Sequence, residues 1–176
     1  RIVVENDDMD ELFSVLFDDA TVAGISDDQS YLWAVGPPNN KIFEIWSKNN
    51  LDNPVSCSHN KSISSIHIHP NSNSIYIGHN DGSIQLNKLD KPCTLTNNMN
   101  GQHVGSISFI SVSDDGKRVF SKGTDHISKY WNAENGQLLA STISLPNHQW
   151  AVVSPNGQFD KSPDFNGLHF TQGFNV

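Results

Sequence analysis

The chain has 176 residues, of which 36% are hydrophobic and 17% charged, so it can bury a sizeable core, and its length alone indicates a single domain. Its formal net charge of -8, with only 11 Lys and Arg residues, argues against nucleic acid and an anionic membrane as partners. No apolar run approaches the roughly 18 residues of a membrane span, and the sequence shows no signal-peptide pattern.

The first 20 residues are expected to form half of a repeated β-sheet unit. Ile2–Val4 lies 43 residues before Ile45–Ser47, in the register of a third strand. Leu12–Phe17 would be the outer strand, after an acidic turn at Asp7–Asp10. A short amphipathic helix at Met9–Phe17 is the alternative, because its apolar residues also fit helical spacing. Since the chain begins within a unit, we expect the fold to extend into a larger protein.

Three complete units follow, at residues 21–58, 59–102 and 103–148. Each combines short apolar runs with turn residues, which is the pattern of half-buried strands joined by hairpins. The outer edge of the second unit is Leu89–Gln102, where Pro92 suits an exposed edge strand. The other strands expected are Val22–Ile25, Tyr31–Val35, Lys41–Trp46, Ile63–Ile68, Ser74–Gly78, Ser83–Lys88, Ile110–Val112, Arg118–Ser121, Ile127–Trp131 and Gln137–Ile143.

Fixed spacings recur along the chain. The step from His59 to Asp81 and the step from His103 to Asp125 are both 22 residues. A period of about 40–45 residues with four strands per unit and a GH…WD pattern is typical of the WD40 blade. The hairpin turns repeat with this period, 43, 44 and 41 residues apart, at Ser26, His69, Ser113 and Ser154.

The sequence therefore resembles the WD40-repeat β-propeller family over nearly its whole length. The resemblance is best in the unit that ends at Trp131 and weakest in the first, where Leu16 stands in place of the histidine. It implies an all-β fold, a propeller segment of about four blades that forms the C-terminal part of a larger propeller, commonly seven-bladed. A closed four-bladed ring is the alternative. The WD dipeptide itself is degraded in every unit, to Trp46-Ser47, Lys88-Leu89 and Trp131-Asn132.

Residues 149–176 are expected to form a divergent last blade and tail. Trp150–Val153 would be its first strand and Ser154–Gly157 the hairpin turn. The stretch resembles a recurring ending of WD40 arrays in bacterial proteins that carry a caspase-like (peptidase C14) or a STAND-type NTPase domain upstream. The matching residues are Trp150, Val152, Val153, Pro155, Gly157, Phe159, Asp160 and Ser162.

The resemblance also assigns a structural role to one set of polar residues. It implies that the indole of Trp131, the hydroxyl of Ser121, the imidazole of His103 and the carboxylate of Asp125 form one hydrogen-bonded chain. Buried polar groups of this kind need partners. No G-x-S-x-G motif surrounds a serine, so we expect structure rather than catalysis. A shorter network is expected at His59 and Asp81, where Ile77 and Lys88 replace the serine and the tryptophan.

A metal site and a disulfide are not expected. Cys57, His59, His67 and His69 invite a zinc interpretation, but His67 faces the opposite side of its strand and the other histidines occupy repeat positions. No calcium-loop, Walker or dinucleotide motif is present, so no cofactor is predicted. Cys57 and Cys93 are expected to pack as small apolar groups in a reducing, cytoplasmic setting.

The function implied by the resemblance is a non-catalytic module for protein–protein interaction or sensing, within a larger bacterial protein whose upstream protease or NTPase domain acts in defence or signalling. A stand-alone WD40 scaffold is the alternative, and an enzyme site in the propeller has little residue support. The expected partners are other protein chains or domains and the remainder of the propeller, not nucleic acid or membrane. Candidate contact loops are Pro37–Asn40, Asn97–Gln102 and Pro146–His148.

Overall fold

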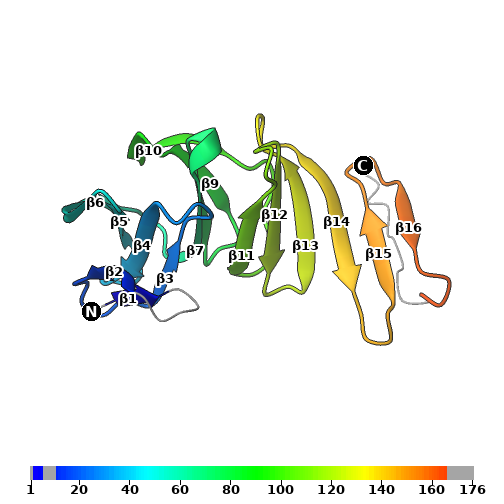
Figure 1. The fold of residues 1–176 in the computed structure, drawn as a ribbon. Coiled ribbons are helices and arrows are strands. Elements are labelled where there is room, and N and C mark those ends of the chain that lie inside the picture. The colour runs from blue at the N-terminus through cyan, green and yellow to red at the C-terminus, as the bar shows by residue number, and fades with distance from the viewer. Residues whose placement is uncertain (1, 6–10, 166–176) are drawn as a thin grey trace.

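The computed structural model describes residues 2–5 and 11–165. Within these residues all regular elements are β-strands except one short 3-10 helix at Pro70–Ser72. The strands form four antiparallel sheets that follow one another along the chain, which we call sheets I to IV (Figure 1). The predicted all-β class is therefore confirmed. No helix in the described part of the chain is long and apolar enough to cross a membrane.

Sheet I is a two-stranded antiparallel pair, β1 (Ile2–Glu5) and β2 (Glu11–Val15), with Ile2 opposite Val15. The segment after Glu11 is thus a strand and not the alternative amphipathic helix. Strand alternation turns Ile2 and Val15 toward sheet II, where they join a buried cluster. The predicted acidic turn at Asp7–Asp10 lies outside the described residues.

Sheets II and III each contain four strands in sequential order. The strands of sheet II are β3 (Val22–Ile25), β4 (Tyr31–Gly36), β5 (Ile42–Ser47) and β6 (Asn50–Ser58). The strands of sheet III are β7 (Ile63–His69), β8 (Ser74–His79), β9 (Ile84–Lys88) and β10 (Lys91–Asn98). Pro92 lies in β10, an edge strand, as predicted.

The hydrophobic core is divided into layers between successive sheets. Ile75 and Ile77 of β8 pack against sheet II, whereas Tyr76 between them packs against sheet IV. This alternation explains why β8 is buried along its whole length, since both of its faces are covered. At Gly78 a Cβ atom would lie 2.6 Å from Ile107, so this glycine lets sheet IV approach closely.

Sheet IV contains six strands rather than the four expected for a repeat unit. Trp150 of β15 pairs with Ser144 of β14, so the described part of the predicted last blade, residues 149–165, continues sheet IV and does not begin a separate sheet. The cause is the turn: Leu145 N–H donates to the carbonyl of Gln149, and the intervening left-handed residues reverse the chain. The strands are β11 (Ile107–Val112), β12 (Arg118–Gly123), β13 (Ile127–Asn132), β14 (Leu138–Ser144), β15 (Trp150–Val153) and β16 (Phe159–Lys161).

A disulfide joins Cys57 of β6 to Cys93 of β10, with a Cα–Cα distance of 5.1 Å. The prediction of two free, packed cysteines is therefore wrong. Sheet packing brings the outer strands of sheets II and III side by side, although 36 residues separate the cysteines in sequence. The expectation of a cytoplasmic setting depended on reduced cysteines, and the disulfide removes that ground.

Candidate functional site

Sheet IV contains a buried chain of four polar side chains, which we call the polar chain: Trp131, Ser121, His103 and Asp125. The indole N–H of Trp131 donates to Ser121 Oγ at 2.9 Å. Ser121 Oγ lies 2.9 Å from His103 Nε2, and His103 Nδ1 lies 3.1 Å from both carboxylate oxygens of Asp125. The structure thus brings together all four residues in the predicted order.

The protonation states follow from these contacts. Burial would raise the pKa of Asp125, but hydrogen bonds from the backbone N–H groups of Val104 and Ile127 and from His103 hold it below its ordinary value. Burial lowers the pKa of His103, with Asp125 opposing that shift only in part. The imidazole is therefore neutral and donates from Nδ1 to Asp125, while Nε2 accepts the hydroxyl hydrogen of Ser121.

Two glycines create the space for the polar chain. A Cβ atom on Gly123 would lie 2.5 Å from both His103 Nδ1 and Asp125 Oδ1. A Cβ atom on Gly82 would lie 2.1 Å from the carbonyl oxygen of His103. Sequence reasoning did not single out Gly123, although Gly36 ends β4 as Gly123 ends β12, which is a repeat signal.

Ser121, His103 and Asp125 have the contacts of a hydrolase triad without its accessibility. Ser121, His103 and Trp131 are each 0% exposed. The Ser121 hydroxyl donates to His103 and accepts from Trp131, so its hydrogen-bonding capacity is occupied by structural partners. A nucleophile must reach its substrate, and this hydroxyl is sealed within the sheet.

Sheet III does not repeat the polar chain, and the predicted shorter network of His59 and Asp81 is wrong. The Asp81 carboxylate pairs with Lys61 Nζ at 2.8 Å and accepts a hydrogen bond from the Ser83 hydroxyl at 2.6 Å. These bonds hold the pKa of Asp81 well below its usual range. The His59 ring packs instead against Phe43, with ring centroids 5.3 Å apart.

The reason for the difference lies at His79, which ends β8 where Gly123 ends β12. Its side chain is buried, both ring nitrogens lack hydrogen-bond partners, and its ring centroid is 5.8 Å from that of His59. Burial, and then the neighbouring His59, lower the pKa of His79 to about 4. The imidazole ring of His79 occupies the position that Gly123 leaves open in sheet IV.

The residue of sheet III that matches Trp131 is Asn87, not Lys88 as predicted. Asn87 pairs with Ile75 as Trp131 pairs with Val119. Its side chain is 0% exposed and donates to the carbonyl of Pro92. The match to Lys88 was one residue too late, because the 44-residue offset from His59 to His103 leads from Asn87 to Trp131.

The residues considered for zinc do not converge. Cys57 is in the disulfide, His69 Nδ1 lies 2.8 Å from the Ser72 hydroxyl, and His67 Nε2 lies 3.2 Å from Asp27 without a well-directed hydrogen bond. No group of three or more His, Cys, Asp or Glu side chains suited to a metal occurs among the described residues.

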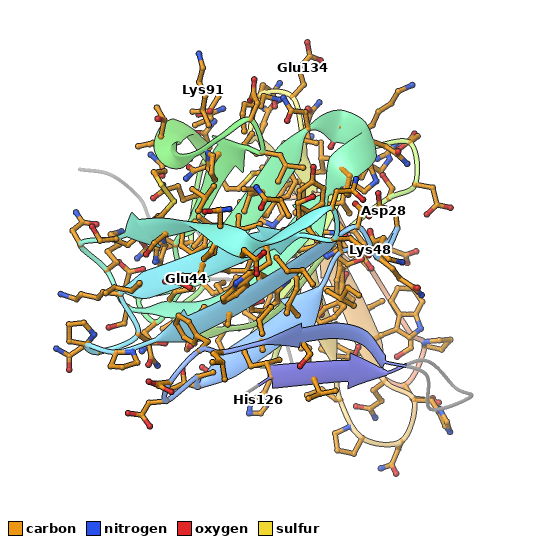
Figure 2. The ribbon with its side chains drawn as sticks, turned by 60° about the vertical axis from the view of Figure 1, so that its left-hand side comes forward. Asp28, Glu44, Lys48, Lys91, His126 and Glu134 are labelled. Atoms are coloured by element: carbon orange, nitrogen blue, oxygen red, sulfur yellow. A yellow bond between two sulfur atoms is a disulfide. The ribbon has the colours of Figure 1, made fainter. Side chains whose placement is uncertain are left out.

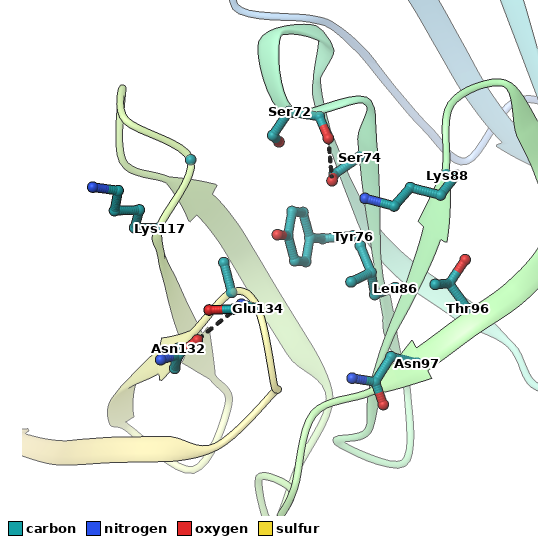
Figure 3. A pocket seen from close by; sticks show the side chains of 12 residues that line it. Ser72, Ser74, Tyr76, Leu86, Lys88, Thr96, Asn97, Lys117, Asn132 and Glu134 are labelled. Atoms are coloured by element: carbon teal, nitrogen blue, oxygen red, sulfur yellow. Dashed lines mark hydrogen bonds between the residues drawn. The ribbon is translucent and has the colours of Figure 1, made fainter.

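A pocket of about 440 Å³ lies between sheets III and IV (Figure 3). Tyr76 and Lys88 belong to one wall, Lys117 and Glu134 to the other, and Asn97 lies near the base of the view. The pocket lies at the end of the sheets from which Lys91 and Glu134 project, opposite the end marked by His126 (Figure 2). Sequence reasoning included Asn97 in a contact loop but missed the rest, which only sheet packing brings together.

The other two predicted contact loops are surface turns. Pro37–Asn40 connects β4 to β5, with left-handed backbone at Asn39 and Asn40. Pro146–His148 connects β14 to β15, also with left-handed residues. Loops of this kind can present side chains to a partner from a rigid sheet.

Comparison with known proteins assigns no family. No protein-family model matches the chain, and no curated protein shows a significant match to it. The polar chain and the inter-sheet pocket are therefore the features from which function is inferred.

Proposed function

We propose that the chain is a WD40-type β-propeller segment that binds other proteins and performs no catalysis itself. The observation that carries this proposal is the burial of the polar chain. Its serine, histidine and aspartate side chains hydrogen-bond to one another within one sheet. Side chains committed to each other stabilise a rigid frame. A rigid frame with polar loops lowers the ordering cost of capturing a partner.

The arrangement of the sheets supports the propeller interpretation. Four-stranded antiparallel sheets pack in succession, each burying a layer of apolar side chains against the next. Leu32, Ile75 and Val119 occupy equivalent positions opposite Trp46, Asn87 and Trp131 in sheets II, III and IV. Equivalent positions in successive sheets are what a repeat architecture requires.

We also propose that the segment is part of a larger propeller. Val3 of β1 and Leu16, directly after β2, are 40% and 80% exposed. Apolar side chains on the open face of a sheet favour burial against another layer. A further blade would cover them. The ending of the chain favours a caspase-like or NTPase domain elsewhere in the same protein as the source of chemistry.

Labelling with a fluorophosphonate tests the non-catalytic part of this proposal. We expect no adduct on Ser121, because its hydroxyl is buried and bonded on both sides. As a positive control for reactivity, the same reagent is applied to a serine hydrolase under the same conditions. Recovery of a Ser121 adduct from the folded chain by mass spectrometry would refute the proposal.

Photo-crosslinking tests the binding part. A photoreactive amino acid is placed at Asn39 or Asn147 in the intact protein, and captured chains are identified by mass spectrometry. Binding of the purified partner is then measured for Asn39→Gly and Asn147→Gly, because glycine removes the side chain and tolerates the left-handed backbone of these positions. We expect a loss of affinity in at least one loop variant with an unchanged melting temperature. If neither position captures a partner, the proposed contact through these two loops is wrong.

A further inference from the structure

The pocket between sheets III and IV concentrates unpaired hydrogen-bond donors. In Figure 3 the amine of Lys88 and the hydroxyl of Tyr76 point into the space between the sheets. The Asn97 carbonyl oxygen accepts from the N–H of Asn98 at 2.8 Å, which leaves the Asn97 amide hydrogens free to donate. These three groups come from β8, β9 and β10, so one sheet holds them in place.

Two lysines, Lys88 and Lys117, line the pocket. Neither Lys88 nor Lys117 forms an ion pair with any described residue. Lys117 extends along the opposite wall with its amine directed outward, and Glu134 is the one carboxylate that lines the pocket (Figure 3). Lys88 thus brings an ammonium group with no ion-pair partner among the described residues into this pocket, in a chain of net charge -8.

The floor and size of the pocket indicate a ligand larger than an inorganic anion. Leu86, Ala133 and the ring of Tyr76 supply buried apolar surface beneath the donors. A volume of about 440 Å³ is within the range of ligand pockets, which combine apolar lining with a few placed polar groups. Burial raises the pKa of Tyr76, with Ser74 opposing in part, so the phenol keeps its hydrogen at neutral pH.

We propose that this pocket binds an acidic side chain of a partner peptide, with Lys88 as the charged donor, Asn97 and Tyr76 as neutral donors, and Leu86 and Ala133 as the apolar contact for the neighbouring residue of that peptide. The proposal rests on the proposed function of protein binding and names one place and one partner chemistry for it. Charge complementarity selects the partner: a carboxylate gains a charge-assisted hydrogen bond from Lys88, whereas a basic side chain meets an unpaired ammonium group.

The test uses three pools of capped hexapeptides with a fixed central Glu, Gln or Lys and all other positions degenerate. Binding to the chain is followed through the methyl resonances of Leu86 and Ala133 in spectra of isotope-labelled protein. We expect the Glu pool to shift both resonances and the Gln and Lys pools to leave them in place. Equal shifts with the Gln pool, or shifts with the Lys pool alone, overturn the proposal.

Four variants sharpen the test. Lys88→Gln should weaken binding of the Glu pool about tenfold or more, and Lys88→Arg should retain most of it. Glu134→Gln should strengthen binding, because it removes the carboxylate of the opposite wall. Lys48→Gln, which changes the lysine directly after the end of β5 in sheet II, is the control and should bind as the unmodified chain does. The opposite order of Lys88→Gln and Glu134→Gln would identify a basic ligand and refute the proposal.

This outcome is separate from that of the proposed function. If the Glu pool leaves Leu86 and Ala133 unshifted while the loop-directed crosslinks still capture a partner, the pocket proposal alone fails. If the pool binds at the pocket but no partner is captured through the loops, the acidic-peptide site stands and the loops are excluded as the contact surface.

Discussion

Sheets III and IV hold their antiparallel strands together with different chemistry. In sheet IV the polar chain from Trp131 to Asp125 connects β12 and β13 to the segment before β11. In sheet III the equivalent interior holds Ile77 and the unpartnered His79, and the outer strand is instead attached to sheet II through Cys93. One sheet depends on buried hydrogen bonds and the other on a covalent link at its edge.

The difference shows that a repeated spacing does not guarantee a repeated contact. His59 and Asp81 keep the 22-residue spacing of His103 and Asp125, yet Asp81 turns to Lys61 at the surface. The decisive residue is His79, because the ring occupies the position where Gly123 leaves space for an imidazole and a carboxylate. The four predictions below test this contrast.

Removing the disulfide should have the largest effect, and it should act on sheet III. The double variant Cys57→Ser/Cys93→Ser should lose about 4 kcal/mol of unfolding free energy, because a loop of 36 residues is no longer closed in the unfolded chain. Urea denaturation measures this loss. Dithiothreitol should destabilise the unmodified chain by a similar amount and leave the double variant unaffected; insensitivity of the unmodified chain would contradict the cross-link.

Removing the carboxylate of the polar chain should affect sheet IV nearly as strongly. Asp125→Ala leaves His103 Nδ1–H and the N–H groups of Val104 and Ile127 without their acceptor, at an expected cost of about 3 kcal/mol. Asp81→Ala is the matched control and should cost about 0.5 kcal/mol, since its pair with Lys61 is half exposed. Equal losses of unfolding free energy for the two variants in urea denaturation would contradict the proposed difference between the two sheets.

Acidification should destabilise sheet III through His79. The unfolded imidazole binds a proton near pH 6.5, whereas the folded one does so only near pH 4. Its stabilising contribution is therefore complete above pH 6.5 and falls by about 3 kcal/mol as the pH is lowered to 4. His79→Leu should remove this component from the pH dependence of unfolding. Parallel pH profiles for the variant and the unmodified chain would show that His79 is not responsible.

Filling the space at Gly123 should have the smallest effect of the four. Gly123→Ala places a methyl group against His103 and Asp125, and the resulting repacking should cost about 2 kcal/mol. If the methyl group acts through that contact, its cost should shrink in the Asp125→Ala background, where the carboxylate is gone. Strictly additive losses of unfolding free energy in the double variant would show that the cost of Gly123→Ala does not arise from contact with Asp125.

Much of the local structure was predictable from residues near one another in the chain. The all-β class, most strand positions and the hairpin turns follow from alternating apolar residues and from turn residues such as those at Ser113–Gly116. The order of the polar chain was implied by the resemblance to WD40 blades and not by spacing, since His59 and Asp81 share the 22-residue step without forming that contact. The match of Asn87 to Trp131 was missed by one residue, although the 44-residue offset between His59 and His103 leads to it.

By itself, then, the sequence determined the strands and their turns, because these depend on the conformation of short, contiguous segments, while the resemblance that it carries implied the polar chain within sheet IV. Only the tertiary structure decided the disulfide between Cys57 and Cys93, the attachment of β15 and β16 to sheet IV, the replacement of a network by His79, and the pocket around Lys88. Each of these joins segments through the packing of one sheet against another or through the path of a turn. The spacing of residues along the sequence does not specify which faces of two sheets pack together.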